Sequence, residues 1–215
     1  EANEYKDYIL GFIFYKYLSE KMNIFADEIL KQDNVKFRDI TPKTADGKEF
    51  IEAIKEEALE KLGYFLRPEE LFTEVAKRGK GENEDDVDKF DESKTNFILE
   101  DLQKILINIQ LSTMGTDSEE DYENLFEDMD LNSSKLGKTP EARNAIIAKV
   151  LTHLDKIDFK LSDINQVDVL GDAYEYLIGE FASGAGKKAG EFYTPQQVST
   201  ILAKLVTTGK TKLKS

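Results

Sequence analysis

Helical spacing of apolar residues along most of the 215-residue chain predicts an all-α fold, an irregular helical bundle. Apolar and aromatic side chains recur three and four positions apart in several long segments, and no segment shows the alternation typical of a half-buried β-strand. The chain has no cysteine, which excludes disulfides, cysteine-ligated zinc and a thiol nucleophile. A chain of this length buries enough apolar surface to fold without such cross-links.

The first half of the chain is expected to contain three helices. The first spans about 4–31, and its stripe consists of Tyr5, Tyr8, Ile9, Phe12, Ile13, Leu18, Met22, Phe25 and Ile29. Residues 33–47 have turn composition, including Asp46-Gly47, so the second helix is expected to resume at Phe50 and to end at Gly63. A third, short helix follows Arg67-Pro68. Residues 79–88 are rich in acids and glycine and predict a solvated loop.

Three further helices are expected in the second half. Residues 95–114 form a helix whose apolar stripe starts at Phe97, which we expect to be a core residue. Thr139 and Pro140 have the residue types of a helix N-cap and first turn, and the next helix starts there. His153, the only histidine, is expected on its surface. The third stripe has no interruption and comprises Leu170, Ala173, Tyr174, Leu177, Ile178 and Phe181.

Charge is distributed unevenly along the chain. The net charge is -14, the wrong sign for a surface that neutralises DNA phosphates on its own. Residues 182–215, however, carry six lysines and one acid. Residues 117–130 hold eight acids, but Tyr122 stands where a calcium loop needs glycine, so we expect a solvated acidic helix start there. No apolar run reaches the roughly 18 residues that span a bilayer, and a cytoplasmic protein is expected.

A segment rich in glycine and lysine, residues 179–190, precedes Glu191-Phe192-Tyr193-Thr194-Pro195-Gln196. It fits neither the dinucleotide fingerprint, which needs a preceding strand, nor a Walker loop, which needs Ser or Thr after Gly-Lys. Thr194 and Pro195 have the residue types that begin a helix, whose first N–H groups bind carboxylates. Phe192 and Tyr193 add a flat apolar surface. These features also suit an ordinary helix start, and the spacing alone does not decide between the two.

Gly190-Glu191-Phe192-Tyr193-Thr194-Pro195, preceded by Leu170-Gly-Asp-Ala-Tyr-Glu-Tyr-Leu-Ile178, closely resembles the modification subunit (HsdM) of type I restriction-modification systems. Residues 4–21 and 125–137 resemble the same family's first helix and middle section, so the resemblance covers essentially the whole chain. It implies a methyltransferase that uses S-adenosyl-L-methionine and modifies the adenine exocyclic amine in a flipped-out base of duplex DNA.

The resemblance also implies a site, partners and a domain division. Glu191, Phe192, Tyr193, Thr194, Pro195 and Gln196 would lie at the methionine end of the cofactor. Residues 1–160 would form an N-terminal helical domain and residues 161–215 the start of the methyltransferase domain. The family's Gly-rich cofactor loop and its Asn-Pro-Pro motif do not occur here. We therefore expect a chain truncated before a Rossmann-like α/β domain and inactive alone, with no catalytic and no metal-binding residue.

In the family, a specificity subunit reads the DNA sequence and binds two modification subunits, and a restriction subunit completes the system. Because another subunit reads the DNA, an acidic helical domain can belong to a DNA-modifying enzyme without binding DNA phosphates by itself. Two alternatives remain open from the sequence. In the first alternative, the chain is a helical module that contacts protein partners or DNA without touching a cofactor. In the second, it is the methyltransferase part of a fused restriction-methylation enzyme.

Overall fold

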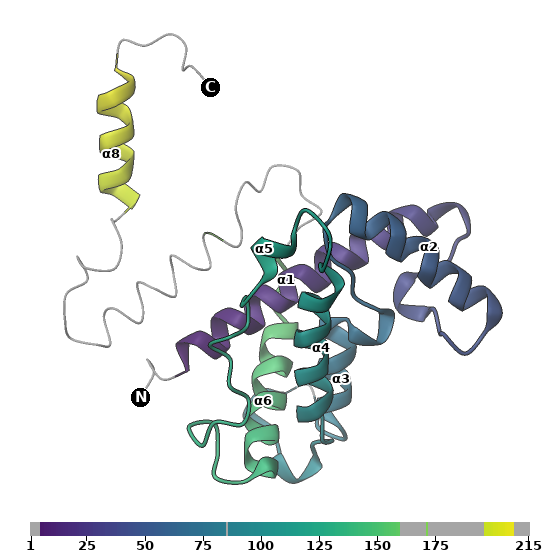
Figure 1. The fold of residues 1–215 in the computed structure, drawn as a ribbon. Helices are drawn as coiled ribbons and strands as arrows, with labels where there is room; N and C mark the ends of the chain where they lie inside the picture. The colour runs from purple at the N-terminus through teal and green to yellow at the C-terminus, as the bar shows by residue number, and fades with distance from the viewer. Residues whose placement is uncertain (1–4, 85, 160–170, 172–195, 209–215) are drawn as a thin grey trace.

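The computed structural model describes residues 5–84, 86–159, 171 and 196–208, and every regular element in these ranges is helical (Figure 1). The all-α fold class is therefore confirmed for the described part of the chain. The third predicted stripe, residues 170–181, lies outside the described residues except for Gly171. The α-helices are α1 (Lys6–Ile29), α2 (Ala45–Lys61), α3 (Phe72–Lys80), α4 (Leu99–Ser112), α5 (Glu119–Tyr122), α6 (Pro140–Asp155) and α8 (Gln196–Thr207).

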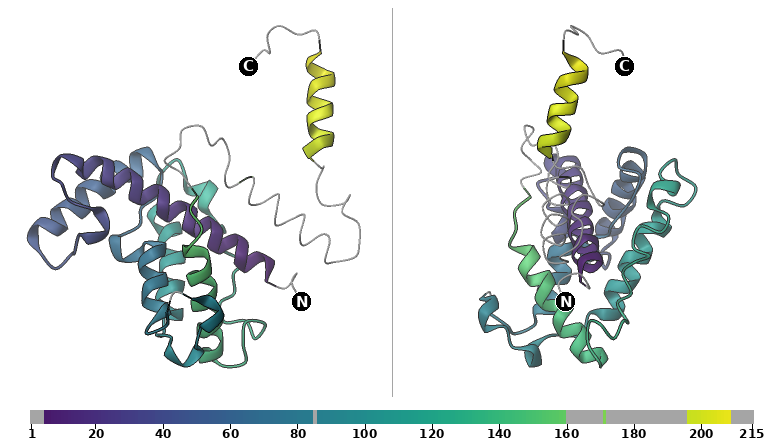
Figure 2. Two further views of the ribbon diagram at one scale, coloured as in Figure 1. Left: turned by 180° about the vertical axis from the view of Figure 1, so that it is seen from behind. Right: turned by 90° about the vertical axis from the view of Figure 1, so that its left-hand side faces the viewer.

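Helix α1 is the element around which α2 to α6 are arranged (Figures 1 and 2). It crosses the bundle obliquely, with α3, α4 and α6 along one side and α2 against its C-terminal half. Its buried face follows helical spacing through Tyr8, Phe12, Tyr15, Leu18, Met22 and Ala26. The predicted stripe is confirmed at Tyr8, Phe12, Ile13, Leu18 and Met22, but Ile29 is 38% exposed and was wrongly included. One continuous apolar core joins this helix to the other helices of residues 5–159.

Tyrosine hydroxyls connect α1 to distant backbone carbonyls. Tyr8 Oη donates to the Asp130 carbonyl at 2.9 Å, and Tyr15 Oη donates to the Glu70 carbonyl. In the opposite direction, Tyr64 Oη donates to the Leu18 carbonyl at 2.8 Å, inside α1 itself. Burial raises the pKa of both Tyr15 and Tyr64 well above the usual tyrosine value, because the phenolate would be desolvated. These hydroxyls are structural donors.

Helix α2 begins earlier than predicted. Asp46 and Gly47 were expected in a turn, yet both lie in the first turn of the helix. Thr44 explains the difference, because its Oγ1 accepts a hydrogen bond from the Gly47 backbone N–H at 3.1 Å and caps the helix. An ideal Cβ on Gly47 would lie 2.0 Å from the Thr41 carbonyl oxygen, so the glycine serves close packing. Gly63, with φ +80°, follows the helix end, as predicted.

The predicted acidic loop starts two residues later than expected, because α3 continues to Lys80 and buries Gly79 against Ile98. The loop itself is anchored by Asn83, which is buried. Its Nδ2 donates to the Lys80 carbonyl, and its Oδ1 accepts from the Asp91 N–H at 2.7 Å. The described acidic residues around it, Glu82, Glu84, Asp86 and Asp88, are exposed, in agreement with a solvated loop.

Helix α4 begins at Leu99, one turn after the predicted start, and this corrects the expectation for Phe97. Phe97 precedes the helix and is 50% exposed, so it is not a core residue. The residues beside it are held by Asn144 of α6. Asn144 Oδ1 accepts from the Ile98 N–H at 2.8 Å, and its Nδ2 donates to the Asn96 carbonyl at 2.9 Å. One buried amide thereby ties the start of α4 to α6.

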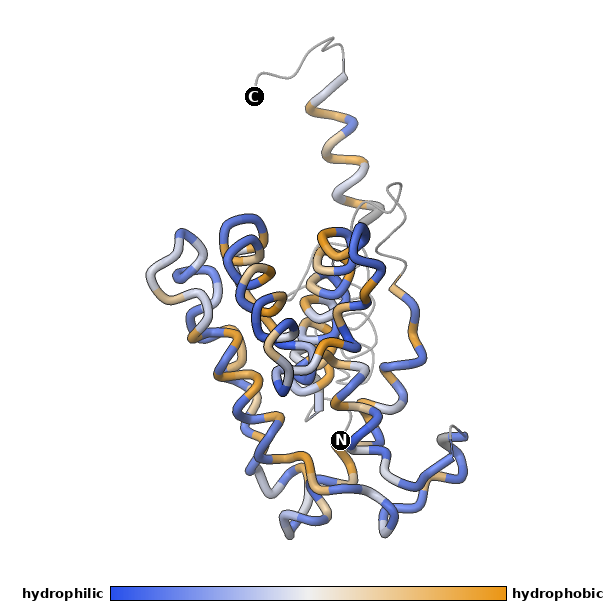
Figure 3. The backbone as a smooth tube through the Cα atoms, turned by 90° about the vertical axis from the view of Figure 1, so that its right-hand side faces the viewer, coloured by the Kyte–Doolittle hydropathy of each residue, from blue (hydrophilic) through white to orange (hydrophobic). Residues whose placement is uncertain are grey.

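The N-terminus of α6 forms as predicted. Thr139 is the N-cap, its Oγ1 accepts from the Ala142 N–H, and Pro140 is the first helical residue. His153 is exposed, as expected. Helix α6 packs extensively against α3 and also contacts α1. In Figure 3, apolar and polar backbone positions alternate along these helices, which is the pattern of amphipathic elements around a shared core.

Residues 117–130 contain only one short helix, α5, which ends before Asn124 at φ 62°. The predicted acidic helix start is therefore confirmed as one turn, and turns continue to about residue 136. Among the described residues, no group of three or more histidine, cysteine or acidic side chains is placed to hold a metal ion. In the same part of the chain, no helix combines the length and apolarity needed to cross a membrane.

Candidate functional site

The cofactor-contacting residues expected from the sequence lie at the edge of the described structure. Glu191, Phe192, Tyr193, Thr194 and Pro195 are outside the described residues. Gln196 is the first described residue of α8. A helix is therefore present directly after the segment that was predicted to start one. The placement of the six side chains at a cofactor stays a prediction.

Helix α8 exposes an apolar stripe. Its five large apolar side chains are 44–66% exposed, at spacings of three and four that place them on one face: Val198, Ile201, Leu202, Leu205 and Val206. Apolar and polar positions along α8 can be followed in Figure 3. Thr207 and Thr208 hydroxyls donate to carbonyls in its last turn and close the helix locally. A stripe of this kind is typical of a helix that packs against further structure.

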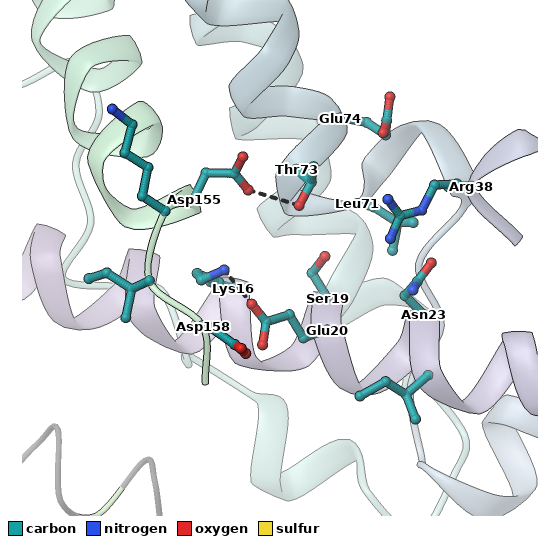
Figure 4. A pocket seen from close by; sticks show the side chains of 13 residues that line it. Lys16, Ser19, Glu20, Asn23, Arg38, Leu71, Thr73, Glu74, Asp155 and Asp158 are labelled. Carbon is teal, nitrogen blue, oxygen red and sulfur yellow. Dashed lines mark hydrogen bonds and ion pairs between the residues drawn. The ribbon is translucent and has the colours of Figure 1, made fainter. Parts of the chain in front are cut away.

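A polar cleft of about 310 Å³ lies where α1, α3 and the end of α6 meet (Figure 4). We call it the α1–α6 cleft. It is lined from α1 by Lys16, Ser19, Glu20, Asn23 and Ile24, from α3 and the residue before it by Leu71, Thr73 and Glu74, and elsewhere by Arg38 and residues 155–158. The cleft thus lies beside the last described residues of the helical bundle before 160.

Lys16 is the most unusual residue of the cleft because its charged side chain is only 3% exposed. Its ammonium forms an ion pair with Glu20 one turn later. It also lies 5.5 Å from the ring centroid of Phe72 and 5.1 Å from that of Phe159, within the range of cation–π attraction. An ammonium buried in this way is stabilised by one carboxylate and two aromatic faces.

Glu20 shows the energetic balance of this pair. Burial raises the pKa of Glu20 above its usual value, and the nearby carboxylates of Asp158 and Asp155 raise it further. The ion pair and hydrogen bond with Lys16 lower it, but by less than these effects raise it. Desolvation and the neighbouring carboxylates together therefore outweigh the attraction that Lys16 supplies to Glu20.

Two hydrogen bonds join the walls of the cleft. Ser19 Oγ accepts from the Phe72 N–H at 2.7 Å and links α1 to α3. Thr73 Oγ1 donates to Asp155 Oδ1 at 2.8 Å and links α3 to α6. Each bond pairs a donor on one helix with an acceptor on another, so the two bonds hold α1, α3 and α6 in fixed positions relative to one another. Its described contacts indicate a positioning role.

Sequence reasoning did not single out the cleft. The available signal was the polar pair Lys16 and Ser19, which occurs among the buried positions Phe12, Tyr15 and Met22 of the α1 stripe. Polar residues on a buried helical face indicate that a partner helix supplies their hydrogen-bonding groups.

Comparison with known proteins identifies two successive matches along the chain. Residues 1–154 match the family model "HsdM N-terminal domain", and residues 165–214 match "N-6 DNA Methylase". The chain belongs to the HsdM N-terminal domain family. The resemblance noted from the sequence is thereby confirmed.

Two relatives support the assignment. The HsdM-family chain is 34% identical over 205 residues to the type I restriction enzyme MpnII methylase subunit of Mycoplasma pneumoniae, a match that covers 94% of this chain and 35% of the relative. It is also similar to the crystal structure of the type I restriction-modification system methyltransferase subunit from Streptococcus thermophilus. That match has a TM-score of 0.71 and 36% identity, and it covers 98% of this chain and 40% of the other.

Proposed function

We propose that this HsdM-family chain is the N-terminal part of an adenine-specific DNA methyltransferase subunit of a type I restriction-modification system. The observation that carries the proposal is the order of the two family matches, with the HsdM N-terminal domain directly followed by an N-6 DNA methylase segment. The chain spans somewhat over a third of the length of its relatives, 35% and 40%. The proposal therefore concerns a protein of the relatives' full length.

In that protein, S-adenosyl-L-methionine would contact Glu191, Phe192, Tyr193, Thr194, Pro195 and Gln196. A helix that begins at this segment presents unpaired N–H groups, which suit the carboxylate of the methionine part. The rings of Phe192 and Tyr193 offer an apolar surface to the rest of that part. The proposed division is a helical domain over 1–160 and the start of the methyltransferase domain over 161–215, ahead of a Rossmann-like α/β part.

The same proposal assigns the partners. A specificity subunit supplies sequence recognition, a second modification subunit and a restriction subunit complete the cytoplasmic complex, and duplex DNA is bound through the complex. The net charge of -14 supports this arrangement, because such a chain gains little from DNA phosphates by itself.

Methyl transfer provides the first test. The full-length protein with its specificity subunit, unmethylated duplex DNA and methyl-labelled S-adenosyl-L-methionine should give label in N6-methyladenine. Residues 1–215 alone should give none, because they contain no Asn-Pro-Pro motif to hold the target amine. Label on cytosine would refute adenine specificity, and turnover by the isolated residues would refute their assigned inactivity.

Cofactor binding provides the second test. In the full-length protein, Tyr193→Ala and Thr194→Ala should weaken S-adenosyl-L-methionine binding at least tenfold, or about 1.4 kcal/mol. Their melting temperatures should change less, because a lost helix cap costs about 1 kcal/mol. Leu102→Ala is the matched control, since Leu102 is fully buried in α4 and its truncation should lower stability without touching the cofactor. If both variants bind the cofactor like wild type, the segment is only a helix start, and the interaction-module alternative replaces this assignment.

A further inference from the structure

An apolar groove of about 490 Å³ lies beside α4, on a surface that the proposed function does not use. We call it the α4 groove. Its α4 wall includes Leu106, Ile107 and Gln110, and Phe126 and Met129 face that wall from the chain after α5. Phe126 and Met129 are largely buried, at 8% and 7% exposure, so they form a preformed floor. Asn124, at the rim, has the positive φ of 62° that turns the chain into this wall.

The apolar surface continues from the groove along α4. Ile107 and Leu111, one turn apart on α4, are 53% and 54% exposed, and Met114, in the turn after the helix, is 63% exposed. The C-terminal part of α4 and the turn that follows therefore present exposed apolar side chains next to the groove. This is the surface that an amphipathic helix covers when it binds in a groove, with anchors at the same spacing.

Charge around the α4 groove indicates which kind of helix fits. Residues 99–131, which contain both walls, hold ten acids and one lysine, whereas residues 105–114 have no charge. Within the part of the chain that the structure describes, none of the ion pairs involves one of these ten acids. An uncharged apolar strip thus lies within a segment whose ten acids are all exposed, and one of them, Glu127, lines the groove itself. A basic partner gains from them, whereas a second copy of this surface would meet ten like charges.

We propose that the α4 groove is the docking site for an amphipathic helix of a separate protein subunit, with apolar anchors on one face and lysine or arginine along its edges. The inference rests on the proposed function only in taking that subunit to be the specificity or the restriction subunit of the same system. Among the described helices, α8 is an amphipathic helix of the same chain whose large apolar side chains are exposed and whose one charge is Lys204. Helix α8 lies within the N-6 DNA methylase match, where we expect its apolar face to pack.

Site-specific cross-linking tests the groove. The chain has no cysteine, so Gln103→Cys at the groove wall gives one attachment point for a maleimide–benzophenone reagent in these residues. The full-length modification subunit, with any cysteine beyond these residues replaced, is assembled with its specificity and restriction subunits, illuminated and digested. We expect the cross-linked peptide, identified by mass spectrometry, to be a lysine- or arginine-rich helical segment of one of the two partner subunits.

Two sets of variants make the result specific. Leu111→Gln with Met114→Gln removes apolar anchors from an exposed edge and should lower the cross-link yield at least tenfold at an unchanged melting temperature. Ile29→Gln, at the exposed end of α1, should leave the yield unchanged. Glu127→Lys should lower the yield at low salt and reduce its dependence on salt, because it removes one attractive charge and adds a repulsive one.

Three outcomes would overturn the proposal: a cross-link to residues 196–207, a cross-link to a second modification subunit, or no partner cross-link in a complex that methylates DNA. A complex that fails to methylate any DNA would instead count against the proposed function. Because methylation is measured on the same assembled sample, the two failures are distinguishable.

Discussion

The ion pair of the α1–α6 cleft gives a quantitative prediction. Lys16→Met keeps the length of the side chain but removes the ammonium, which is 3% exposed, while the Glu20 side chain is 25% exposed. Removal of one partner from a fully buried pair costs about 3–5 kcal/mol, and from a surface pair about 0–1 kcal/mol. Since the remaining carboxylate is partly solvated, we expect a loss of about 2 kcal/mol, or roughly 4–8 °C in melting temperature.

Glu20→Gln should lower the stability more than Lys16→Met does, and the double variant should lose less than the two single changes added together. Glu20→Gln leaves an almost completely buried ammonium without its carboxylate, so it should cost about 3 kcal/mol. Lys16→Met with Glu20→Gln removes both charges and should cost less than the sum of the two single changes by at least about 1 kcal/mol. Calorimetric melts and urea titrations of the four proteins complete the cycle. Strictly additive effects, or a Lys16→Met variant that melts like wild type, would refute this account of the cleft.

Four further predictions follow from named contacts. Asn144→Leu should cost about 1–3 kcal/mol in urea titrations, because it leaves the buried Ile98 N–H without an acceptor. Gly47→Ala should lower the melting temperature, although alanine favours helices by about 1 kcal/mol, because its Cβ would collide with the Thr41 carbonyl. The pKa values of Tyr15 and Tyr64 are raised, so the two protonated hydroxyls contribute fully to the free energy of unfolding below pH ~10, and this contribution is lost as the pH rises above that value. In absorbance titrations both tyrosines should ionise only when the protein unfolds. Residues 1–215 should bind non-specific duplex DNA more weakly than micromolar at about 150 mM salt, as a fluorescence anisotropy titration would show.

The elements that sequence reasoning placed correctly are those specified by adjacent residues. Thr139 and Pro140 start α6 because a cap and a first-turn proline act within four residues. The start of α2 was misplaced because Asp46-Gly47 is common in turns, whereas the hydroxyl of Thr44 stabilises helical N–H groups at the same place. Phe97 continues the apolar spacing of α4, but the hydrogen bonds that Asn144 makes on either side of it hold the chain outside the helix.

Less of the candidate site than of the fold could be predicted from the sequence. The six expected cofactor residues came from a resemblance, and five of them lie outside the described residues. Lys16 lies on the buried face of α1, but the groups that surround its ammonium include Phe72 and Phe159, which are distant in sequence and cannot be inferred from local periodicity. The α4 groove was missed for a related reason. Its floor comes from turns after α5, where no periodic signal exists.

The tyrosine bonds of α1 have a consequence for synthesis on the ribosome. Its hydrogen-bonding partners are translated long after it, since Tyr15 bonds a carbonyl 55 residues later and Tyr8 one 122 residues later. At about 5–20 residues per second, the nascent helix waits roughly 6–24 s for the last of these partners. During that interval Phe12, Met22 and the other core residues of α1 are covered only by the core segments already synthesised. Within residues 5–159, α1 is therefore the helix that a ribosome-associated chaperone has the longest opportunity to bind.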